Sequence, residues 1–244
     1  MDKVLHVQDL SFRYDGHDGA VLDGLSFAVA RGERVGLVGC NGVGKSTLLK
    51  LLVGILPMQT GTLEVGGLAM NRKNLAEIRR KVGYIFQDSD SQLFMPTVQA
   101  DVAFAAENYG YPPDEVAART RRALAAVQIE PYADRPVYRL SGGQKKLASI
   151  AGILTLDPEL ILMDEPSAAL DPRNRRGLIG ILNGLPCAKL IASHDLDFIY
   201  DTCDRVLLLH EGRLAADGDA KAILRDEKLL ERCELELPLR WQRG

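Results

Sequence analysis

The sequence contains no apolar stretch of the roughly 20 residues that a membrane-spanning helix needs. Its longest apolar runs lie around Leu160–Met163 and Val206–Leu209, and they have the length of buried strands. The opening residues Met1–Val4 do not begin an apolar signal segment either. We therefore expect no direct membrane span, and any role at a membrane would depend on a partner.

Cysteine is scarce, and its spacing argues against two common kinds of site. None of the four cysteines lies in a CxxC pair, which disfavours a zinc site and a disulfide framework. The four are Cys40, Cys187, Cys203 and Cys233. We expect reduced thiols, as in a cytosolic protein.

An excess of charge of one sign is also missing. The chain has 30 Lys and Arg against 33 Asp and Glu, a net charge of −3, whereas general nucleic-acid binders are usually strongly basic. Local basic clusters at Arg79–Lys81 and Arg119–Arg122 are better explained as solvated helix faces. We expect no nucleic-acid partner.

Near its start, the sequence contains two segments in which apolar and polar residues alternate. The 244 residues, 46% hydrophobic and 26% charged, suffice for one large α/β domain or two small ones. Apolar and polar residues alternate along Val4–Phe12 and Val21–Val29, with Asp15–Gly16 and Asp18–Gly19 between them. This pattern predicts two antiparallel strands joined by a turn.

Further along the chain, buried-strand patterns alternate with helical ones. Strands are predicted at Arg34–Val38, Thr62–Val65, Leu160–Met163, Lys189–Ser193 and Arg205–His210. Helices are predicted at Ser46–Val53 and over Asp101–Val127, with an interruption at Tyr111–Pro113. The alternation predicts a mainly parallel sheet covered on both faces, with ligands at the strand ends. The charged tail after about Glu227 is expected to pack late or loosely.

A glycine-rich turn between a strand and a helix carries the clearest chemical signal. Residues Gly39–Thr47 fit the phosphate-loop pattern GxxxxGK[ST]. Glycines let backbone N–H groups turn inward around phosphate oxygens, and the following helix directs its positive N-terminus at the same anion. Lys45 would meet the β- and γ-phosphates, and the Ser46 hydroxyl would join the shell of a Mg²⁺ ion. The candidate nucleotide-binding residues are Gly39, Asn41, Gly42, Gly44, Lys45, Ser46 and Thr47.

An acidic pair follows the apolar strand Leu160–Met163. Asp164, at the strand end, is predicted to hold Mg²⁺ through water. Glu165 projects differently and is predicted to orient or deprotonate an attacking water. A strand-ending acidic turn before Pro166 is the alternative, and the phosphate loop upstream makes it the weaker one.

The segment Leu140–Gln144 reads LSGGQ and lies between these two motifs. Ser141 and Gln144 match a capping box at a helix start. A helix N-terminus with two glycines and a serine is also a second anion site. Ser141, Gly142, Gly143 and Gln144 are therefore candidate phosphate-binding residues as well as helix-capping ones.

The order of these motifs resembles that of the ATP-binding cassette (ABC) family over nearly the whole chain. The ordered features are Tyr14, the phosphate loop, Gln87, LSGGQ, Asp164–Glu165, Ser167–Asp171 and His194. The resemblance implies an α/β ABC ATPase fold in one domain over residues 1–244. That domain would have a P-loop RecA-like core, an N-terminal antiparallel β subdomain, a helical insert at about residues 88–137 and a tail at about 227–244.

The resemblance also implies ligands and residue roles. ATP and Mg²⁺ would bind in a head-to-tail dimer, with ATP on one subunit's loop covered by the other subunit's Ser141–Gln144. Tyr14 would stack on adenine, although a packed aromatic beside a turn is the alternative. Gln87 would reach Mg²⁺ and the water. His194 would bind the γ-phosphate and help position Glu165, although a histidine after a strand is usually only a polar strand end.

Within the family, the segment Gln87–Phe94 resembles that of energy-coupling-factor ATPases, the group that contains cobalt and nickel importers. Asp90, Gln92 and Leu93 keep that group's pattern, whereas Ser89 replaces its usual proline. Further along, Ala105 stands where the cobalt group often has glycine, and Leu147 where a basic residue is usual.

The resemblance implies an ATP-hydrolysing subunit that energises uptake of a small solute, with cobalt or nickel as the leading candidate. It would sit at the cytoplasmic face of the cell membrane, bound to transmembrane subunits and to a second ATPase subunit, either identical or a paralogue. Vitamin uptake by an energy-coupling-factor transporter is one alternative. A soluble ABC ATPase of DNA repair or translation is another, but the chain has neither long coiled coils nor two cassettes. Glu165 and His194 argue against a regulator without turnover.

Overall fold

The computed structural model describes residues 2–16 and 19–242, and it contains two sheets with helices around them. The larger sheet has six strands in the order β10-β9-β3-β8-β7-β6. All neighbours in it are parallel except β10, which runs antiparallel to β9. Its strands are β3 (Arg34–Val38), β6 (Val82–Ile85), β7 (Leu160–Asp164), β8 (Ala188–Ala192), β9 (Arg205–His210) and β10 (Arg213–Asp219).

The smaller sheet contains the predicted N-terminal strands. Its order is β2-β1-β4-β5, and every pair is antiparallel. The strands are β1 (Lys3–Phe12), β2 (Leu22–Ala30), β4 (Thr60–Val65) and β5 (Leu68–Ala69). Of the turn residues predicted between β1 and β2, Asp18 lies outside the described residues.

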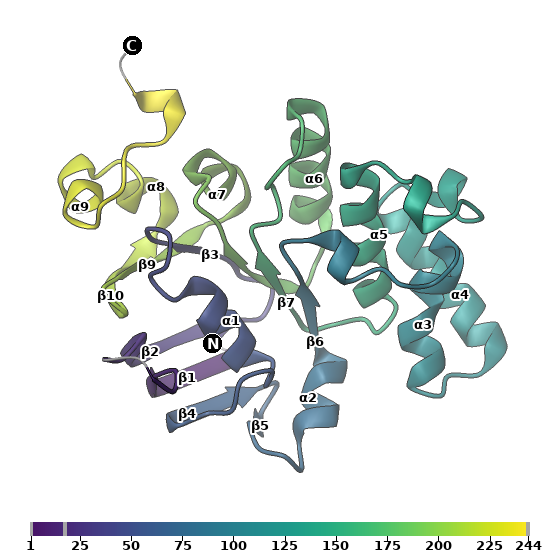
Figure 1. The fold of residues 1–244 in the computed structure, drawn as a ribbon, viewed down its shortest axis with the longest axis horizontal. Coiled ribbons are helices and arrows are strands. Elements are labelled where there is room, and N and C mark those ends of the chain that lie inside the picture. Colours follow the sequence, from purple (N-terminus) through teal and green to yellow (C-terminus); the bar gives the residue numbers. More distant parts are fainter. Residues whose placement is uncertain (1, 17–18, 243–244) are drawn as a thin grey trace.

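The parallel strands of the larger sheet are buried on both faces, as their continuous apolar sequences predict, whereas the edge strand β10 alternates exposed and half-buried residues. Side chains alternate between the faces along each strand, so Leu160 and Leu162 of β7 join one hydrophobic cluster and Ile161 and Met163 join the other. The first cluster also contains α1 (Lys45–Leu52), which lies between the two sheets (Figure 1). The second contains residues of the helices on the opposite face.

Of the remaining helices, α2 (Leu75–Lys81) contributes Ile78 to the first cluster, and the others cover the opposite face and one end of the molecule (Figure 1). The others are α3 (Val98–Asn108), α4 (Pro113–Ala126), α5 (Gly142–Leu154), α6 (Pro172–Gly184), α7 (Leu196–Thr202), α8 (Ala220–Ile223) and α9 (Glu227–Arg232), with single 3₁₀ turns at Ser89–Ser91, Glu130–Tyr132, Val137–Arg139 and Leu239–Trp241.

The predicted helical stretch divides into α3 and α4 at the interruption that its prolines predict. Pro113 begins α4, where its missing N–H costs no hydrogen bond. Both helices pack against α5. Leu147, which departs from the family pattern, is a half-buried residue of α5 packed against the second cluster.

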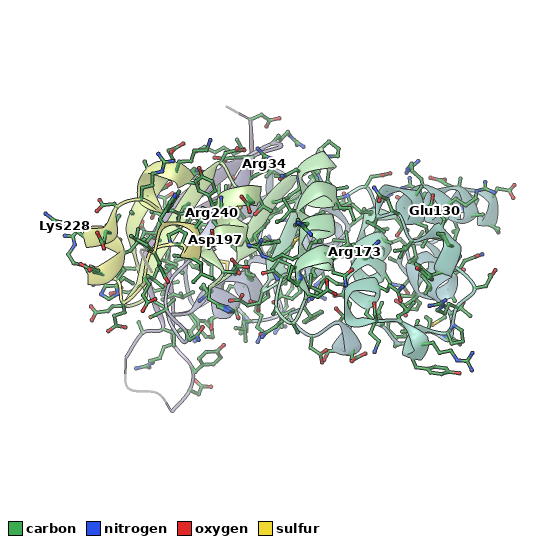
Figure 2. All side chains as sticks on the ribbon, turned by 90° about the horizontal axis from the view of Figure 1, so that it is seen from above. Arg34, Glu130, Arg173, Asp197, Lys228 and Arg240 are labelled. Atoms are coloured by element: carbon green, nitrogen blue, oxygen red, sulfur yellow. The ribbon has the colours of Figure 1, made fainter. Side chains whose placement is uncertain are left out.

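The prediction that the C-terminal tail packs loosely is wrong. Trp241 meets the Tyr200 ring edge-on at 5.0 Å, and the Arg225 guanidinium lies 5.1 Å from the Trp241 ring centre. Arg240 forms ion pairs with Asp197 and with Asp201. The charged residues of the tail therefore attach it to α7, and Figure 2 shows Arg240 beside Asp197.

Candidate nucleotide site

A polar cavity of about 420 Å³ lies where β3, β7 and β8 end. It is lined by Asn41, Gly42, Gly44, Lys45, Ser46, Thr47, Gln87, Glu165 and His194. Parallel strands end at a common edge of a sheet, so the residues that follow them meet there although they are far apart in sequence. The structure thus brings together the predicted phosphate loop, the predicted base and the two residues assigned to it by resemblance.

The loop after β3 has a backbone that requires glycine at two positions. Gly39 and Gly44 have φ angles of 154° and 110°. A Cβ on Gly39 would lie 2.5 Å from the Leu209 carbonyl oxygen, and one on Gly44 would lie 2.7 Å from Leu22 Cδ2. Only glycine therefore lets the loop pass this close to its neighbours while it curves around the start of α1.

Lys45 is held inside this loop. Its side chain is buried, and Nζ donates to the carbonyl oxygens of Gly39 at 2.7 Å and Cys40 at 3.1 Å. Burial lowers the pKa of Lys45, and the nearby Glu165, Cys40 and Asp164 act in the opposite direction. An anion in the cavity would further favour the charged ammonium.

Ser46 and Asp164 form a pair at the edge of the cavity. The Ser46 hydroxyl donates to Asp164 Oδ1 at 3.0 Å, and the Tyr84 hydroxyl lies 3.5 Å from Oδ2. Burial raises the pKa of Asp164, a direction that a bound cation would reverse. A hydroxyl beside a buried carboxylate is a hard oxygen donor set of the kind that Mg²⁺ takes.

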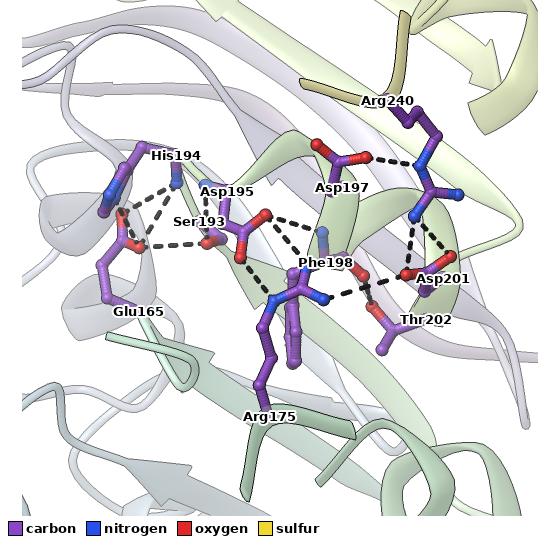
Figure 3. A network of polar contacts seen from close by, with 10 residues as sticks. All are labelled: Glu165, Arg175, Ser193, His194, Asp195, Asp197, Phe198, Asp201, Thr202 and Arg240. Carbon is purple, nitrogen blue, oxygen red and sulfur yellow. Dashed lines mark hydrogen bonds and ion pairs between the residues drawn. The ribbon is translucent and has the colours of Figure 1, made fainter. Parts of the chain in front are cut away.

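Glu165 has an unusual backbone conformation, and both of its carboxylate oxygens accept hydrogen bonds. Its φ is 45°, a left-handed conformation that costs a non-glycine residue about 1–2 kcal/mol. Its Oε2 accepts from the Ser193 hydroxyl at 3.0 Å and lies 2.9 Å from His194 Nδ1, while Oε1 accepts from the His194 backbone N–H at 3.1 Å (Figure 3). The strained turn and these contacts fix the carboxylate where β7 and β8 end.

A further set of hydrogen bonds holds the loop after β8 that contains His194. The Ser193 hydroxyl also accepts from the Asp195 backbone N–H at 3.1 Å. Asp195 caps α7 through the Phe198 N–H and receives two hydrogen bonds from Arg175 of α6 (Figure 3). These hydrogen bonds connect the loop that contains His194 to both α6 and α7.

Several predicted residues lie outside the cavity lining, namely Tyr14, Gly39, Asp164 and the segment 141–144. The Tyr14 hydroxyl is 3.1 Å from the Thr47 hydroxyl, and its ring meets Phe12 edge-on at 4.9 Å. Ser141 and Gln144 form the predicted capping box at the start of α5. Neither Tyr14 nor the segment 141–144 is among the described residues that line the cavity.

The signature segment instead lies beside α6. A Cβ on Gly143 would lie 2.8 Å from Asn174 Cγ, so Gly143 allows α5 to approach α6 closely. Asp171 caps α6 by accepting from the N–H groups of Arg173 and Asn174. Two of the predicted motifs therefore share this side of the molecule.

Sequence reasoning missed three residues that hold the site together. Ser193 bonds Glu165, Tyr84 approaches Asp164, and Lys146 donates to the carbonyl oxygen of Gln87. Ser193 carried a usable signal, since it immediately precedes His194 at a strand end. Nothing in the local pattern distinguishes Lys146 from the neighbouring Lys145, because the deeper burial of Lys146 is a result of tertiary packing.

The family model described as ABC transporter matches residues 22–168. The chain belongs to this family. A Streptomyces coelicolor protein whose name places it among ABC transporter ATP-binding proteins is 47% identical over 96% of this chain and 90% of its own length. The energy-coupling factor transporter ATP-binding protein EcfA of Methanocaldococcus jannaschii is 40% identical over 96% of this chain and 86% of its own length.

A solved structure supports the same membership for this ABC ATPase. CbiO1 from Clostridium perfringens, described as part of the ABC transporter complex CbiONQ, is 35% identical with a TM-score of 0.86. The match covers 95% of this chain and 94% of CbiO1. The predicted α/β ABC ATPase fold is therefore confirmed, as is the enzyme class, an ATPase that couples hydrolysis to transport.

Two further observations concern metals and membranes. Within residues 2–16 and 19–242, no group of three or more His, Cys, Asp and Glu side chains could hold a metal ion. No helix in the same part of this ABC ATPase is both long and apolar enough to cross a bilayer.

Proposed function

We propose that this ABC ATPase binds ATP in the cavity at the end of β3 and energises uptake of a divalent transition metal ion, cobalt or nickel. The loop Gly39–Thr47 would hold the phosphates through its backbone N–H groups and the N-terminus of α1. Lys45 is close enough to the cavity to meet the β- and γ-phosphates once its bonds to the loop carbonyls are exchanged. Tyr14, attached to Thr47 by a hydroxyl contact, would provide the face for adenine.

Ser46, Asp164 and Gln87 are the residues that would hold Mg²⁺. Ser46 and Asp164 are already hydrogen-bonded to each other, and Gln87 lines the same cavity. The ion would supply charge neutralisation for the phosphate oxygens. Within the chain, Tyr84 keeps the Asp164 side chain oriented, and burial keeps bulk water from competing for it.

Glu165 is the proposed base. Its carboxylate lines the cavity and is held by Ser193 and His194, so it is directed at the space where the attacking water would lie. His194, whose side chain is exposed, could leave Glu165 to hydrogen-bond a γ-phosphate. Ser193 would then keep the carboxylate in place.

The proposed second half of the site comes from another subunit. Ser141–Gln144 lie at the N-terminus of α5, a helix end that favours anions, and outside this chain's own cavity. A head-to-tail dimer, of two copies or of this chain and a paralogue, would bring the segment over the partner's ATP.

The proposed contact with a transmembrane subunit is the surface around Phe94. Phe94 is 64% exposed and stacks edge-on against Phe104, which is 38% exposed. Buried Asp101 accepts from the backbone N–H groups of Phe94 and Met95, which fixes the loop. Exposed aromatics on a fixed loop favour a protein partner, and such a partner would hold the subunit at the cytoplasmic face of the membrane.

Three other residues of the segment 87–94 make their contacts inside the chain. Leu93 is buried, and Asp90 is paired with Lys145 of α5 rather than free for a partner. Gln92 uses its amide to accept from Phe86 N–H at 3.2 Å. Asp90 and Gln92 thus have partners inside the chain, which leaves the exposed rings of Phe94 and, on α3, of Phe104 for contact with another protein.

The choice of solute rests on the likeness to CbiO1 and on the energy-coupling-factor pattern at residues 87–94. The test is accumulation of cobalt, nickel and vitamins in the native host with the gene deleted and restored as parent or as Glu165→Gln. We expect cobalt or nickel uptake to return only with the parent. Restored vitamin uptake with unchanged metal uptake would identify the vitamin alternative, and no change in either would contradict a role in import of these solutes.

A further inference from the structure

Helix α5 begins with the signature segment, and a side chain in its second turn contacts the loop that follows β6. Lys146, in the second turn of α5, is only 3% exposed. Its Nζ donates to the carbonyl oxygens of Phe86 at 2.8 Å and Gln87 at 2.9 Å. A side chain of the signature helix therefore holds the backbone of the residue proposed to meet the γ-phosphate and Mg²⁺.

This position is costly for a lysine, which argues against an incidental contact. The Lys146 side chain is almost wholly removed from water, and the carbonyl oxygens of Phe86 and Gln87 accept from its ammonium. Buried cationic groups are uncommon unless their hydrogen bonds are satisfied. The two carbonyl oxygens lie just beyond the end of β6, and the lysine supplies donors to both.

A second, more exposed contact also connects α5 to the segment that follows β6. Lys145, the residue before, forms an ion pair with Asp90, which is 67% exposed. Such surface pairs contribute little in water. The buried contact of Lys146 is thus the stronger of the two connections between α5 and the segment 86–90.

We propose that Lys146 is a positioning residue that makes Gln87 and the signature segment Ser141–Gln144 move together. Occupancy of the subunit's own nucleotide site, sensed at Gln87, is thereby transmitted through α5 to the surface that covers the nucleotide of the partner subunit. The proposal rests on the roles assigned above to Gln87 and to the signature segment. It adds an intrachain connection between them that neither motif contains.

The test compares Lys146→Met with Lys145→Met. Methionine retains an unbranched apolar side chain and removes the donors, while the second variant removes only the exposed ion pair. For Lys146→Met we expect kcat to fall by at least about tenfold with the dissociation constant for ATP within about threefold of the parent. For Lys145→Met we expect kcat within about threefold of the parent. Equal kcat for parent and Lys146→Met would overturn the proposal.

Hydrogen–deuterium exchange separates positioning from general stability. It is measured with and without a non-hydrolysable ATP analogue, at concentrations where sedimentation shows a monomer, so that no partner can protect residues 141–150. In the parent, the analogue should change exchange at both 84–95 and 141–150. In Lys146→Met the change should be confined to 84–95. Faster exchange throughout the chain would mean that Lys146 only stabilises the fold, and would overturn the proposal.

Lys146→Gln is the second variant if the methionine variant does not fold. It is shorter than lysine and neutral, and it can reach at most one of the two carbonyl oxygens, so the same loss of coupled exchange is expected. A folded Lys146→Gln protein with coupled exchange would contradict the proposal. Failure of the proposed function would give a different result from failure of this proposal. In that case the parent protein itself would neither hydrolyse ATP nor change its exchange when the analogue is added.

Discussion

The phosphate-loop side of the molecule and the signature side differ in how complete they are within one chain. On the first side, Lys45, the Ser46–Asp164 pair and the Glu165–His194 pair already have contacts to one another or to the loop. On the second, Ser141 and Gln144 only cap their own helix. One half of the machinery is assembled by folding, and the other half has a proposed use only opposite a second subunit.

The difference follows from the origin of each side. The phosphate-loop residues follow parallel strands, so the sheet itself brings them to one edge. The signature residues start a helix that packs on α3, α4 and α6, and these residues themselves lie outside the cavity at that edge. A change on the first side should therefore affect nucleotide binding or chemistry within the subunit, and a change on the second should affect assembly.

The largest expected effect belongs to Glu165→Gln, which keeps size and hydrogen bonding but removes the base. We expect ATP hydrolysis to fall by at least about a hundredfold, ATP binding to persist, and an ATP-stabilised dimer to accumulate, as measured by turnover and sedimentation. The control is Glu211→Gln, because Glu211 also has a positive φ of 47° but lies away from the cavity. Parental turnover in Glu165→Gln would refute the assignment of the base.

Lys45→Ala should act first on the affinity for ATP and only then on the chemical step. Loss of a buried ammonium that meets two phosphates should weaken ATP binding by roughly tenfold to a hundredfold, measured by calorimetry. Lys50→Ala is the matched control, since Lys50 is on the same helix and outside the cavity. Equal ATP affinity in Lys45→Ala and the parent, with both folded, would show that the lysine does not contact the nucleotide.

Ser141→Arg tests the other side. The arginine should block the partner's γ-phosphate by bulk, so turnover should fall by at least about tenfold while ATP binding by the monomer is unchanged. Ser141→Ala, which loses only the cap on Gln144 N–H, separates this block from helix destabilisation. If Ser141→Arg hydrolyses ATP normally, one subunit suffices and the two sides do not differ as argued.

The same difference explains what the sequence could predict. The strand ends and the phosphate loop are local patterns, and residues such as Lys45, Asp164 and Glu165 lie together in the structure as their positions after strands predict. The burial of Lys146 and the docking of Trp241 onto Tyr200 depend on contacts between distant segments. Periodicity carries no information about such contacts, which is why the tail was wrongly predicted to be loose.

The smallest expected effect on the isolated chain belongs to Phe94→Ser. Phe94 is 64% exposed, so its removal creates no large cavity, and Asp101 still binds the loop through backbone N–H groups. Surface substitutions of this kind usually change stability by no more than about 0.5 kcal/mol. We therefore expect ATP binding, basal hydrolysis and thermal unfolding to match the parent.

The effect should appear only with the membrane partner. An exposed aromatic at the centre of a protein interface often contributes more than about 2 kcal/mol to binding, so Phe94→Ser should reduce co-purification with the transmembrane subunit and lower solute uptake. Leu239→Ser is the control, because Leu239 is 76% exposed but lies on the C-terminal tail. Normal assembly and uptake by Phe94→Ser, or an equal loss in Leu239→Ser, would mean that the partner binds elsewhere. The loop after Gln87 would then serve the subunit's own motifs alone, and the side of the molecule argued here to depend on partners would depend only on a second ATPase subunit.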